Sequence, residues 1–236
     1  MRSRVKKVQI IVTCEHGGNR IPARYRPLFD KNPSALDTHR GFDAGALQFA
    51  HDLAKTTDAF LVTATTSRLL VELNRTVGNQ RLFSEFTHDL PSAEKEEILL
   101  RHYFPYRDRV ESIIREALAR GSRVLHLSSH SFTPELDGEV RDADLGLLYD
   151  PRRAAEAEFC RAWRLALKTR APELKVRFNY PYQGKSDGLA TWLRGRFPGE
   201  VYAGIEIEAN QAHVHAGPSH WKTIRRALIG ALPRTG

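Results

Sequence analysis

Cysteine is scarce in this chain of 236 residues, and long apolar runs are absent. Two cysteines, Cys14 and Cys160, are too few for a disulfide framework and indicate a reducing compartment. No stretch approaches the roughly 20 apolar residues that a membrane-spanning helix needs. The basic N-terminus leads into an apolar run without a small-residue cleavage site, so we expect no signal peptide. The sequence therefore predicts a cytoplasmic protein that does not enter a membrane.

Blocks of like charge are also absent, although the formal net charge is +8. The arginines are scattered and are not interleaved with aromatic residues, so nucleic acid is not the favoured partner. A positive cleft would equally attract a small anionic substrate. The apolar fraction of 41% and the charged fraction of 27% are those of an ordinary globular protein. We expect one domain that spans residues 1–236.

Apolar runs and helical patterns alternate along the whole chain. The predicted strands and helices belong to an α/β fold, a single domain with a mixed, mostly parallel sheet and helices on both faces. Pro105 is expected to break or kink the helix predicted over 91–120. The strands are predicted over 8–13, 59–65, 68–73, 124–129, 146–149, 175–178 and 201–207, and the helices over 43–57, 91–120, 150–168, 189–196 and 218–232.

Polar side chains stand at the ends of four of these predicted strands. The first strand stops at Glu15-His16, and the others end in Asn74-Arg75, His130 and Glu206. Ligands of open α/β sheets bind just outside the carboxyl ends of the strands. The four endings therefore predict one shared site.

His16 and His130 are the candidate metal ligands. Neutral imidazole suits Zn²⁺, and a catalytic zinc ion takes three protein ligands and leaves one position for water. The sequence does not decide the third metal ligand, for which Asp43, Asp37 and Asn19 are the candidates. In the alternative interpretation, each histidine is paired with a backbone carbonyl and Asp43 is a helix N-cap.

Arg68, Asn74 and Arg75 are candidates for an anion clamp, because a guanidinium matches a carboxylate with two parallel hydrogen bonds. The alternative for these arginines is a structural salt bridge with Glu72 or Asp43.

Glu206 and Glu208 alternate with isoleucines and so point to one face of their strand. An unpaired carboxylate inside an apolar strand is costly, but burial beside a metal-bound water gives a general base a useful pKa. One of the two glutamates is therefore a candidate base, and the other a partner for an arginine.

Six ordered motifs resemble the N-formylglutamate amidohydrolase family: E-H-G-G-N-R-I-P, D-T-H-R-G-F-D-A-G-A, L-L-V-E-L-N-R, S-H-S-F-T-P, N-Y-P-Y-Q-G-K-S-D-G and G-I-E-I-E-A-N-Q. That family is in turn similar to zinc carboxypeptidases and aspartoacylases, which share a mixed α/β sheet and one catalytic zinc. The resemblance implies that the zinc ligands include His16 and His130. It places the substrate carboxylate on Asn74 and Arg75, with Arg68 as a second clamp, and the general base on Glu206 rather than Glu208.

Asn19 departs from the broader pattern, which has a glutamate ligand at that position. Because an amide oxygen is a poor substitute for a carboxylate on zinc, Asp43 is the favoured third ligand. Asn179 and Tyr180 of the N-Y-P-Y loop are expected to line the pocket.

The sequence thus predicts a zinc-dependent amidohydrolase of small acidic N-acyl amino acids, with N-formyl-L-glutamate as the leading substrate. The alternatives are a carboxypeptidase-like peptidase or another N-acyl amino acid deacylase, a basic anion- or nucleic-acid-binding module, and an inactive family member. The short loops leave little room for a peptide groove, which counts against the peptidase.

Overall fold

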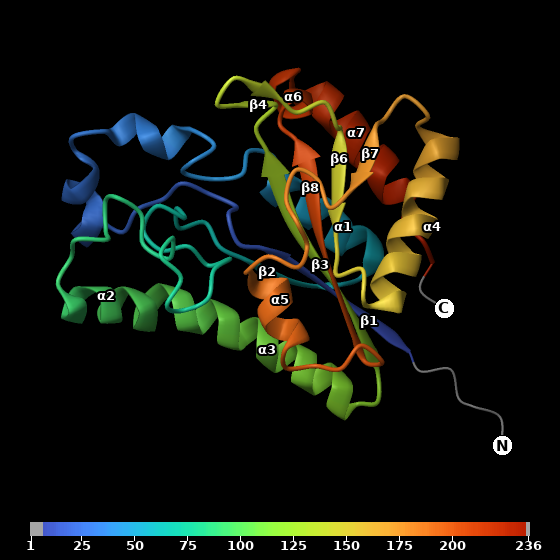
Figure 1. Cartoon of the computed structure of the whole chain (residues 1–236), viewed down its shortest axis with the longest axis horizontal. Coiled ribbons are helices and arrows are strands. Elements are labelled where there is room, and N and C mark those ends of the chain that lie inside the picture. The colour runs from blue at the N-terminus through green and yellow to red at the C-terminus, as the bar shows by residue number, and fades with distance from the viewer. Residues whose placement is uncertain (1–6, 235–236) are drawn as a thin grey trace.

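The computed structural model describes residues 7–234, and its centre is a six-stranded sheet with the order β2-β1-β3-β8-β6-β7 (Figure 1). Strands β2, β1, β3 and β8 are parallel, whereas β6 and β7 run together in the opposite direction. The predicted mixed, mostly parallel sheet is therefore confirmed. The strands are β1 Val8–Cys14, β2 Phe60–Thr63, β3 Arg123–Phe132, β6 Leu145–Leu148, β7 Val176–Phe178 and β8 Tyr202–Asn210, and a separate hairpin contains β4 Glu135–Leu136 and β5 Glu139–Val140.

Helices cover both faces of this sheet, as the sequence predicted. They are α1 Ala46–Thr57, α2 Ser92–Ile98, α3 Phe104–Ala119, α4 Ala154–Arg170, α5 Leu189–Arg194, α6 Ala212–His215 and α7 Pro218–Gly230. Two short 3₁₀ helices, Ala23–Phe29 and Pro33–Asp37, precede α1. No helix within residues 7–234 has the length and apolarity that crossing a membrane requires.

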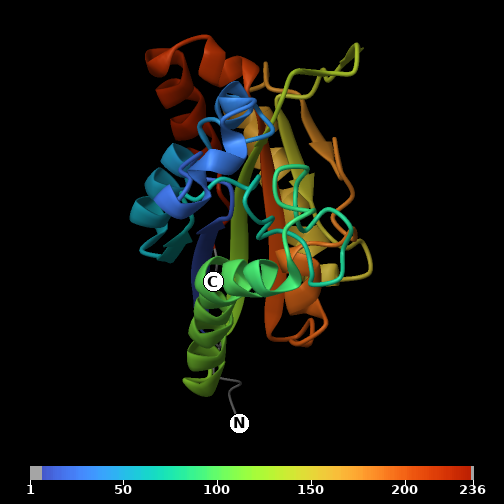
Figure 2. The same ribbon diagram turned by 90° about the vertical axis from the view of Figure 1, so that its left-hand side faces the viewer.

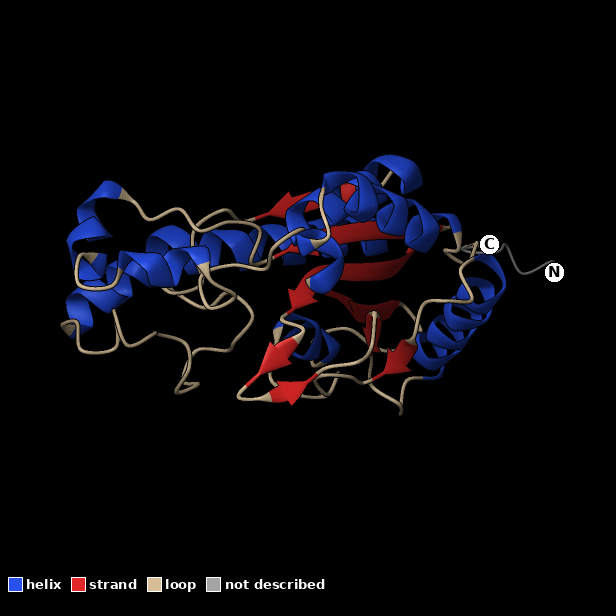
Figure 3. Ribbon diagram, turned by 90° about the horizontal axis from the view of Figure 1, so that it is seen from above, coloured by secondary structure: helices blue, strands red, loops and turns tan. Residues whose placement is uncertain are grey.

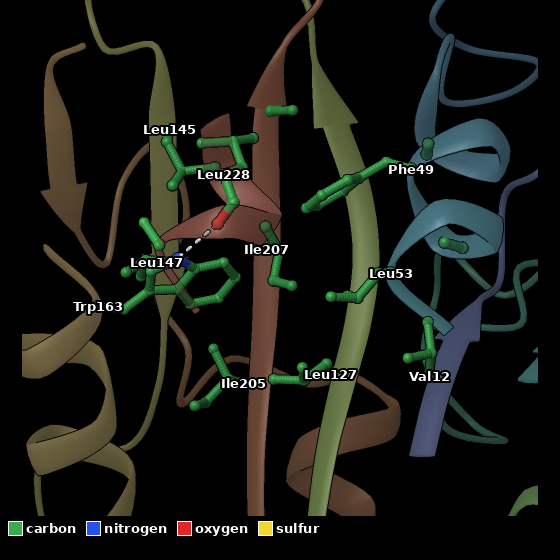
Figure 4. Packing of buried hydrophobic residues seen from close by; sticks show 14 of the residues in the cluster. Val12, Phe49, Leu53, Leu127, Leu145, Leu147, Trp163, Ile205, Ile207 and Leu228 are labelled. Atoms are coloured by element: carbon green, nitrogen blue, oxygen red, sulfur yellow. Dashed lines mark hydrogen bonds between the residues drawn. The ribbon is translucent and has the colours of Figure 1, made fainter. Parts of the chain in front are cut away.

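One face of the sheet is a continuous apolar layer beneath α1, α4 and α7. Alternate residues of the central strands, such as Leu127 of β3 and Ile205 of β8, pack there against Phe49 and Trp163 (Figure 4). The Trp163 indole donates a hydrogen bond to the carbonyl of Leu228, which joins α4 to α7. The side chains of this face form a hydrophobic core between the sheet and these helices.

The opposite face is divided along the strands. Near the amino ends of the parallel strands, Ile11, Val124 and Tyr202 lie in a second apolar cluster with residues of α3 and α5. Toward the carboxyl ends, the residues on this face become Ser128 and His130 on β3 and Glu206 and Glu208 on β8. Because the polar end is buried, its side chains must satisfy one another.

Long loops extend from the sheet beyond the polar end. The segment before α1 and the connection from β2 to α2 reach out together, away from α4 (Figure 1), and Figure 3 shows them as an arm beside the strands. The connection from β2 to α2 also lies near α5 in the view of Figure 2.

Three sequence predictions need correction. Residues 68–73 form turns and not a strand, and their leucines are buried in the second cluster. The helix predicted over 91–120 is interrupted before Pro105, as expected, but by a π-helical segment at Leu99–Tyr103, so that Pro105 lies in the first turn of α3, where helices tolerate proline. Helix α1 begins later than predicted, and its N-cap is Gly45 with φ 79°, so Asp43 is free of that role.

Candidate metal centre and substrate cavity

A cavity of about 1160 Å³ opens at the polar end of the sheet. The turn after β1 supplies His16, and strands β3 and β8 supply His130, Glu206 and Glu208. The loop between β2 and α2 supplies Arg68, Glu72, Asn74 and Arg75. All of these side chains line the cavity. Residues from the loop after β7 and from the β4 side of the hairpin complete the wall. Most of the polar groups predicted from sequence therefore share one cavity.

Three buried side chains within it form a possible metal centre. One ligand atom from each of His16, Asp43 and His130 lies within 4.8 Å of the other two. The Nδ1 atoms of both histidines point to the same carboxylate oxygen, Asp43 Oδ2, at 3.2 and 3.0 Å. Two imidazole nitrogens and one carboxylate oxygen are a donor set that zinc accepts. The residues present therefore fit a single divalent cation.

Among the three candidates for the third ligand, the structure brings only Asp43 to the histidines. Asn19 instead donates a hydrogen bond to Asp37 at 2.8 Å, at an exposed position. Asp43 is held by the backbone, because its N–H bonds to the carbonyl of His16 at 2.9 Å.

Each histidine also contacts a buried glutamate through its other ring nitrogen. His130 Nε2 lies 3.0 Å from Glu15 Oε2, and His16 Nε2 is hydrogen-bonded to Glu72 Oε1. The sequence indicated neither contact: Glu15 is next to His16 in the chain but serves the other histidine, and Glu72 was considered only as a partner for Arg68.

Three buried carboxylates surround the two histidines. They belong to Asp43, Glu15 and Glu72, and Arg68 pairs with two of them. Burial lowers the pKa of both histidines, but the adjoining carboxylates outweigh it and raise each pKa above 6.5. Burial raises the pKa of Asp43, yet the histidines and Arg68 hold it well below its usual range. Positive charge at this position is therefore stabilised by the carboxylates, whether protonated imidazoles or a bound cation supply it.

The two arginines of the predicted anion clamp have different surroundings. Arg68 binds Glu72 Oε2 through Nε at 2.8 Å and Asp43 Oδ1 through a terminal nitrogen at 3.1 Å. The alternative of a structural salt bridge is thus confirmed for Arg68. Arg75 donates only to the carbonyls of Asn74 and Asp187, at 2.7 and 2.9 Å, and pairs with no carboxylate within residues 7–234.

The two glutamates of β8 also differ. Asn74 Nδ2 donates to Glu206 Oε2 at 3.3 Å, and the side-chain Oδ1 of Asn74 accepts from the N–H of Leu189 at 2.6 Å. Glu208 Oε2 is buried with no hydrogen-bond partner among the described residues. Burial is the largest cause that raises the pKa of Glu208, to about 8.

The N-Y-P-Y loop does not supply the pocket residues that the sequence predicted. The Asn179 side chain accepts from the N–H groups of Tyr149 and Gly184, and the Tyr180 ring packs edge-on against Phe132. Neither Asn179 nor Tyr180 lines the cavity; Tyr182 and Gln183 of the same loop do. The loop bends at Asn179, whose φ is 50°, and the sequence motif does not indicate which of its residues face the cavity.

A parallel α/β sheet that holds a His–Asp–His cluster and two buried glutamates beside a cavity has the layout of a hydrolytic enzyme. Comparison with known proteins makes this more specific. Residues 8–214 match the family model for N-formylglutamate amidohydrolase, so the chain belongs to the N-formylglutamate amidohydrolase family.

Solved structures agree on the fold. A gene product of Agrobacterium tumefaciens, Atu2144, is 28% identical, with a TM-score of 0.81 over 96% of this chain and 90% of its own. An N-formylglutamate amidohydrolase from Ralstonia eutropha is 19% identical, with a TM-score of 0.74 over 95% and 92% of the two chains. A search of the curated proteins gives no match.

Proposed function

We propose that this protein hydrolyses the amide bond of a small acidic N-acyl amino acid, with N-formyl-L-glutamate as the first candidate, and that it uses one zinc ion. The observation that carries the proposal is the buried His16–Asp43–His130 donor set beside a glutamate pair in one cavity. Family membership supports amide hydrolysis, and the choice of substrate follows from the Ralstonia relative.

His16, Asp43 and His130 would hold the cation. When bound there, zinc polarises the scissile carbonyl and lowers the pKa of water. The carboxylates of β8 then move the proton: Glu206, the base that the sequence predicted, or Glu208 takes it from water and returns it to the leaving amine. Glu208 has the stronger support, because its Oε2 is buried without a hydrogen-bond partner among the described residues, whereas Glu206 Oε2 already accepts from Asn74.

Arg75 and Asn74 would bind a substrate carboxylate. The Arg75 guanidinium is anchored to the backbone by one nitrogen and has no carboxylate of its own, so it is available to an anion in the cavity. Arg68 has a supporting role here: it neutralises Glu72 and Asp43 and is not a free clamp.

The cavity volume favours a second candidate within the same chemistry. About 1160 Å³ exceeds the roughly 300–1,000 Å³ of typical small-ligand pockets. This volume supports a larger substrate than the sequence argument from short loops, which counted against a peptide groove. A longer acyl group or a short peptide is the second candidate.

A hydrolysis screen tests the proposal. The purified protein, stripped by a chelator and then reloaded with zinc, is assayed by NMR on formyl-, acetyl- and longer-chain acyl-glutamate and on dipeptides. We expect zinc-dependent release of glutamate, fastest from the formyl substrate. Faster cleavage of long acyl chains or dipeptides would select the second candidate. No hydrolysis of any of them, together with salt-dependent retention on DNA, would overturn the proposal in favour of a basic binding module.

A further inference from the structure

Two buried glutamates of the cluster have no part in the chemistry proposed above. Glu15 is 0% exposed and Glu72 is 6% exposed. A buried carboxylate is costly unless it is paired and hydrogen-bonded, so each must have compensating partners. These partners include the two histidines of the candidate metal centre.

Glu15 holds His130 from the carboxyl end of β1. Its Oε2 lies 3.0 Å from His130 Nε2 and accepts a 2.6 Å hydrogen bond from the Ser128 hydroxyl. Its Oε1 accepts a 2.8 Å bond from the Tyr106 hydroxyl of α3. Because donors from β3 and α3 fix both oxygens, the carboxylate is a rigid support for the imidazole.

Glu72 holds His16 in a corresponding way from the loop between β2 and α2. Its Oε1 contacts His16 Nε2 and accepts a 2.9 Å bond from the N–H of Asn74. Its Oε2 accepts from Arg68 Nε at 2.8 Å. This carboxylate is therefore also fixed through both oxygens.

The two contacts leave the opposite nitrogen of each ring directed at the centre. His16 Nε2 is hydrogen-bonded to Glu72, and His130 Nε2 is hydrogen-bonded to the Ser128 hydroxyl at 2.9 Å, which in turn donates to Glu15. The Nδ1 atom of each ring therefore faces Asp43 Oδ2, at 3.2 and 3.0 Å. A carboxylate on the far nitrogen of a metal-binding histidine fixes its tautomer and its orientation and increases its basicity.

We propose that Glu15 and Glu72 are positioning residues that fix His16 and His130 as Nδ1 ligands of the metal ion. The inference rests on the proposed function, because it assumes that the centre holds a cation. It adds two residues outside the donor set that determine how tightly the cation is held.

The test compares three glutamine variants, each of which removes one buried carboxylate: Glu15→Gln, Glu72→Gln and the control Glu156→Gln. Glu156 is 0% exposed and pairs with Arg194 away from the cavity, so its variant reproduces the loss of a buried charge without touching the centre. The zinc Kd is measured by chelator competition on the folded proteins, and the visible spectrum is recorded after cobalt substitution. We expect Kd to rise about 10–100-fold for each positioning variant, with an altered cobalt spectrum. The control keeps the wild-type Kd and spectrum.

A second measurement uses the wild-type protein and does not depend on how the variants fold. In the zinc-loaded protein, ¹⁵N NMR of the imidazoles should show His16 and His130 protonated at Nε2. Wild-type Kd in both positioning variants, or protonation of either ring at Nδ1, overturns the inference. If the wild-type protein itself binds no zinc, the proposed function fails instead, so the two failures are distinguishable.

Discussion

The two faces of the central sheet come from the same strands but serve opposite purposes. On β8, Ile205 and Ile207 point into the apolar layer beneath α4 and α7, while Glu206 and Glu208 point into the cavity. On β3, Leu127 lies on the apolar face, and Ser128 and His130 follow on the polar one.

This difference shows how the fold compensates for a site whose buried charges contribute little stability. Asp43, Glu15 and Glu72 are paired with His16, His130 and Arg68 on one face, but burial of charge contributes little net stability. The opposite face supplies the hydrophobic stabilisation that the charged cluster lacks. Substitutions on the apolar face should therefore change stability, and substitutions on the polar face should change chemistry.

The largest effect is expected on kcat, and it tests which of Glu206 and Glu208 transfers the proton. Glu206→Gln and Glu208→Gln both preserve side-chain shape, and the variant that removes the proton-transfer group should lower kcat about 10²–10⁴-fold while retaining zinc. We expect this for Glu208→Gln and a smaller loss for Glu206→Gln, measured as steady-state kinetics with metal analysis. The reverse order would return the role to Glu206, as the sequence predicted.

On the apolar face, Leu127→Ala should cost about 2–5 kcal/mol of unfolding free energy, because Leu127 is fully buried and the change leaves a cavity. Urea denaturation of the zinc-free protein measures it. Leu165→Ala is the matched control, since Leu165 of α4 is 68% exposed and its loss should matter little. A Leu127→Ala protein with normal stability but a weaker zinc Kd would contradict the division between the faces.

Arg75 and Arg68 both line the cavity, but we expect their substitutions to change different quantities. Arg75→Gln should raise KM for N-formylglutamate about 10–100-fold, because a charge-assisted hydrogen bond contributes roughly 1.5–3 kcal/mol, with little change in zinc affinity. Arg68→Gln should alter zinc affinity, because it leaves Asp43 and Glu72 without their guanidinium. Kinetics and chelator competition on both variants measure this, and an unchanged KM for Arg75→Gln would remove the residue from substrate binding.

The smallest effect concerns His126, a buried histidine of the polar face outside the cavity lining. Burial lowers its pKa to about 4, and its ring bonds to Thr13 and Tyr202. The unfolded chain takes up this proton near pH 6.5 and the folded protein only near pH 4, so His126 destabilises the fold as pH falls through that window. The cost at pH 5 is about 2 kcal/mol.

Denaturation of wild type and His126→Gln at pH 7.5 and pH 5 measures this contribution. The variant should lose less stability between the two values than wild type. Equal losses would show that His126 is protonated in the folded state already.

The residues that follow period-2 patterns could be predicted from the sequence, and those placed by loops could not. The alternation on β8 correctly put Glu206 and Glu208 on one face, and the predicted ends of the strands over 8–13 and 124–129 located the two histidines, although β3 continues past His130 to Phe132. The run from Leu69 to Leu73 is apolar in the way of a buried strand, yet it forms turns whose side chains fill the second cluster. Periodicity cannot distinguish these cases, because both bury consecutive apolar residues.

Contacts between residues far apart in the chain also could not be predicted from the sequence. Glu15 reaches His130, and Glu72 reaches His16 across 56 positions of the chain. Such pairs follow from the packing of a loop against strand ends, which local spacing does not encode. For the same reason, the sequence could not show that Tyr182 and Gln183, rather than Asn179 and Tyr180, line the cavity.

Zinc stoichiometry tests the central claim most directly. The wild-type protein and the variants His16→Ala, Asp43→Ala and His130→Ala are dialysed against limiting zinc, and bound metal is measured by plasma emission spectrometry. The account predicts one tightly bound equivalent in wild type and none in each variant, while all four remain folded by circular dichroism. Full zinc retention in any of the three variants, or none in the wild type, would contradict it.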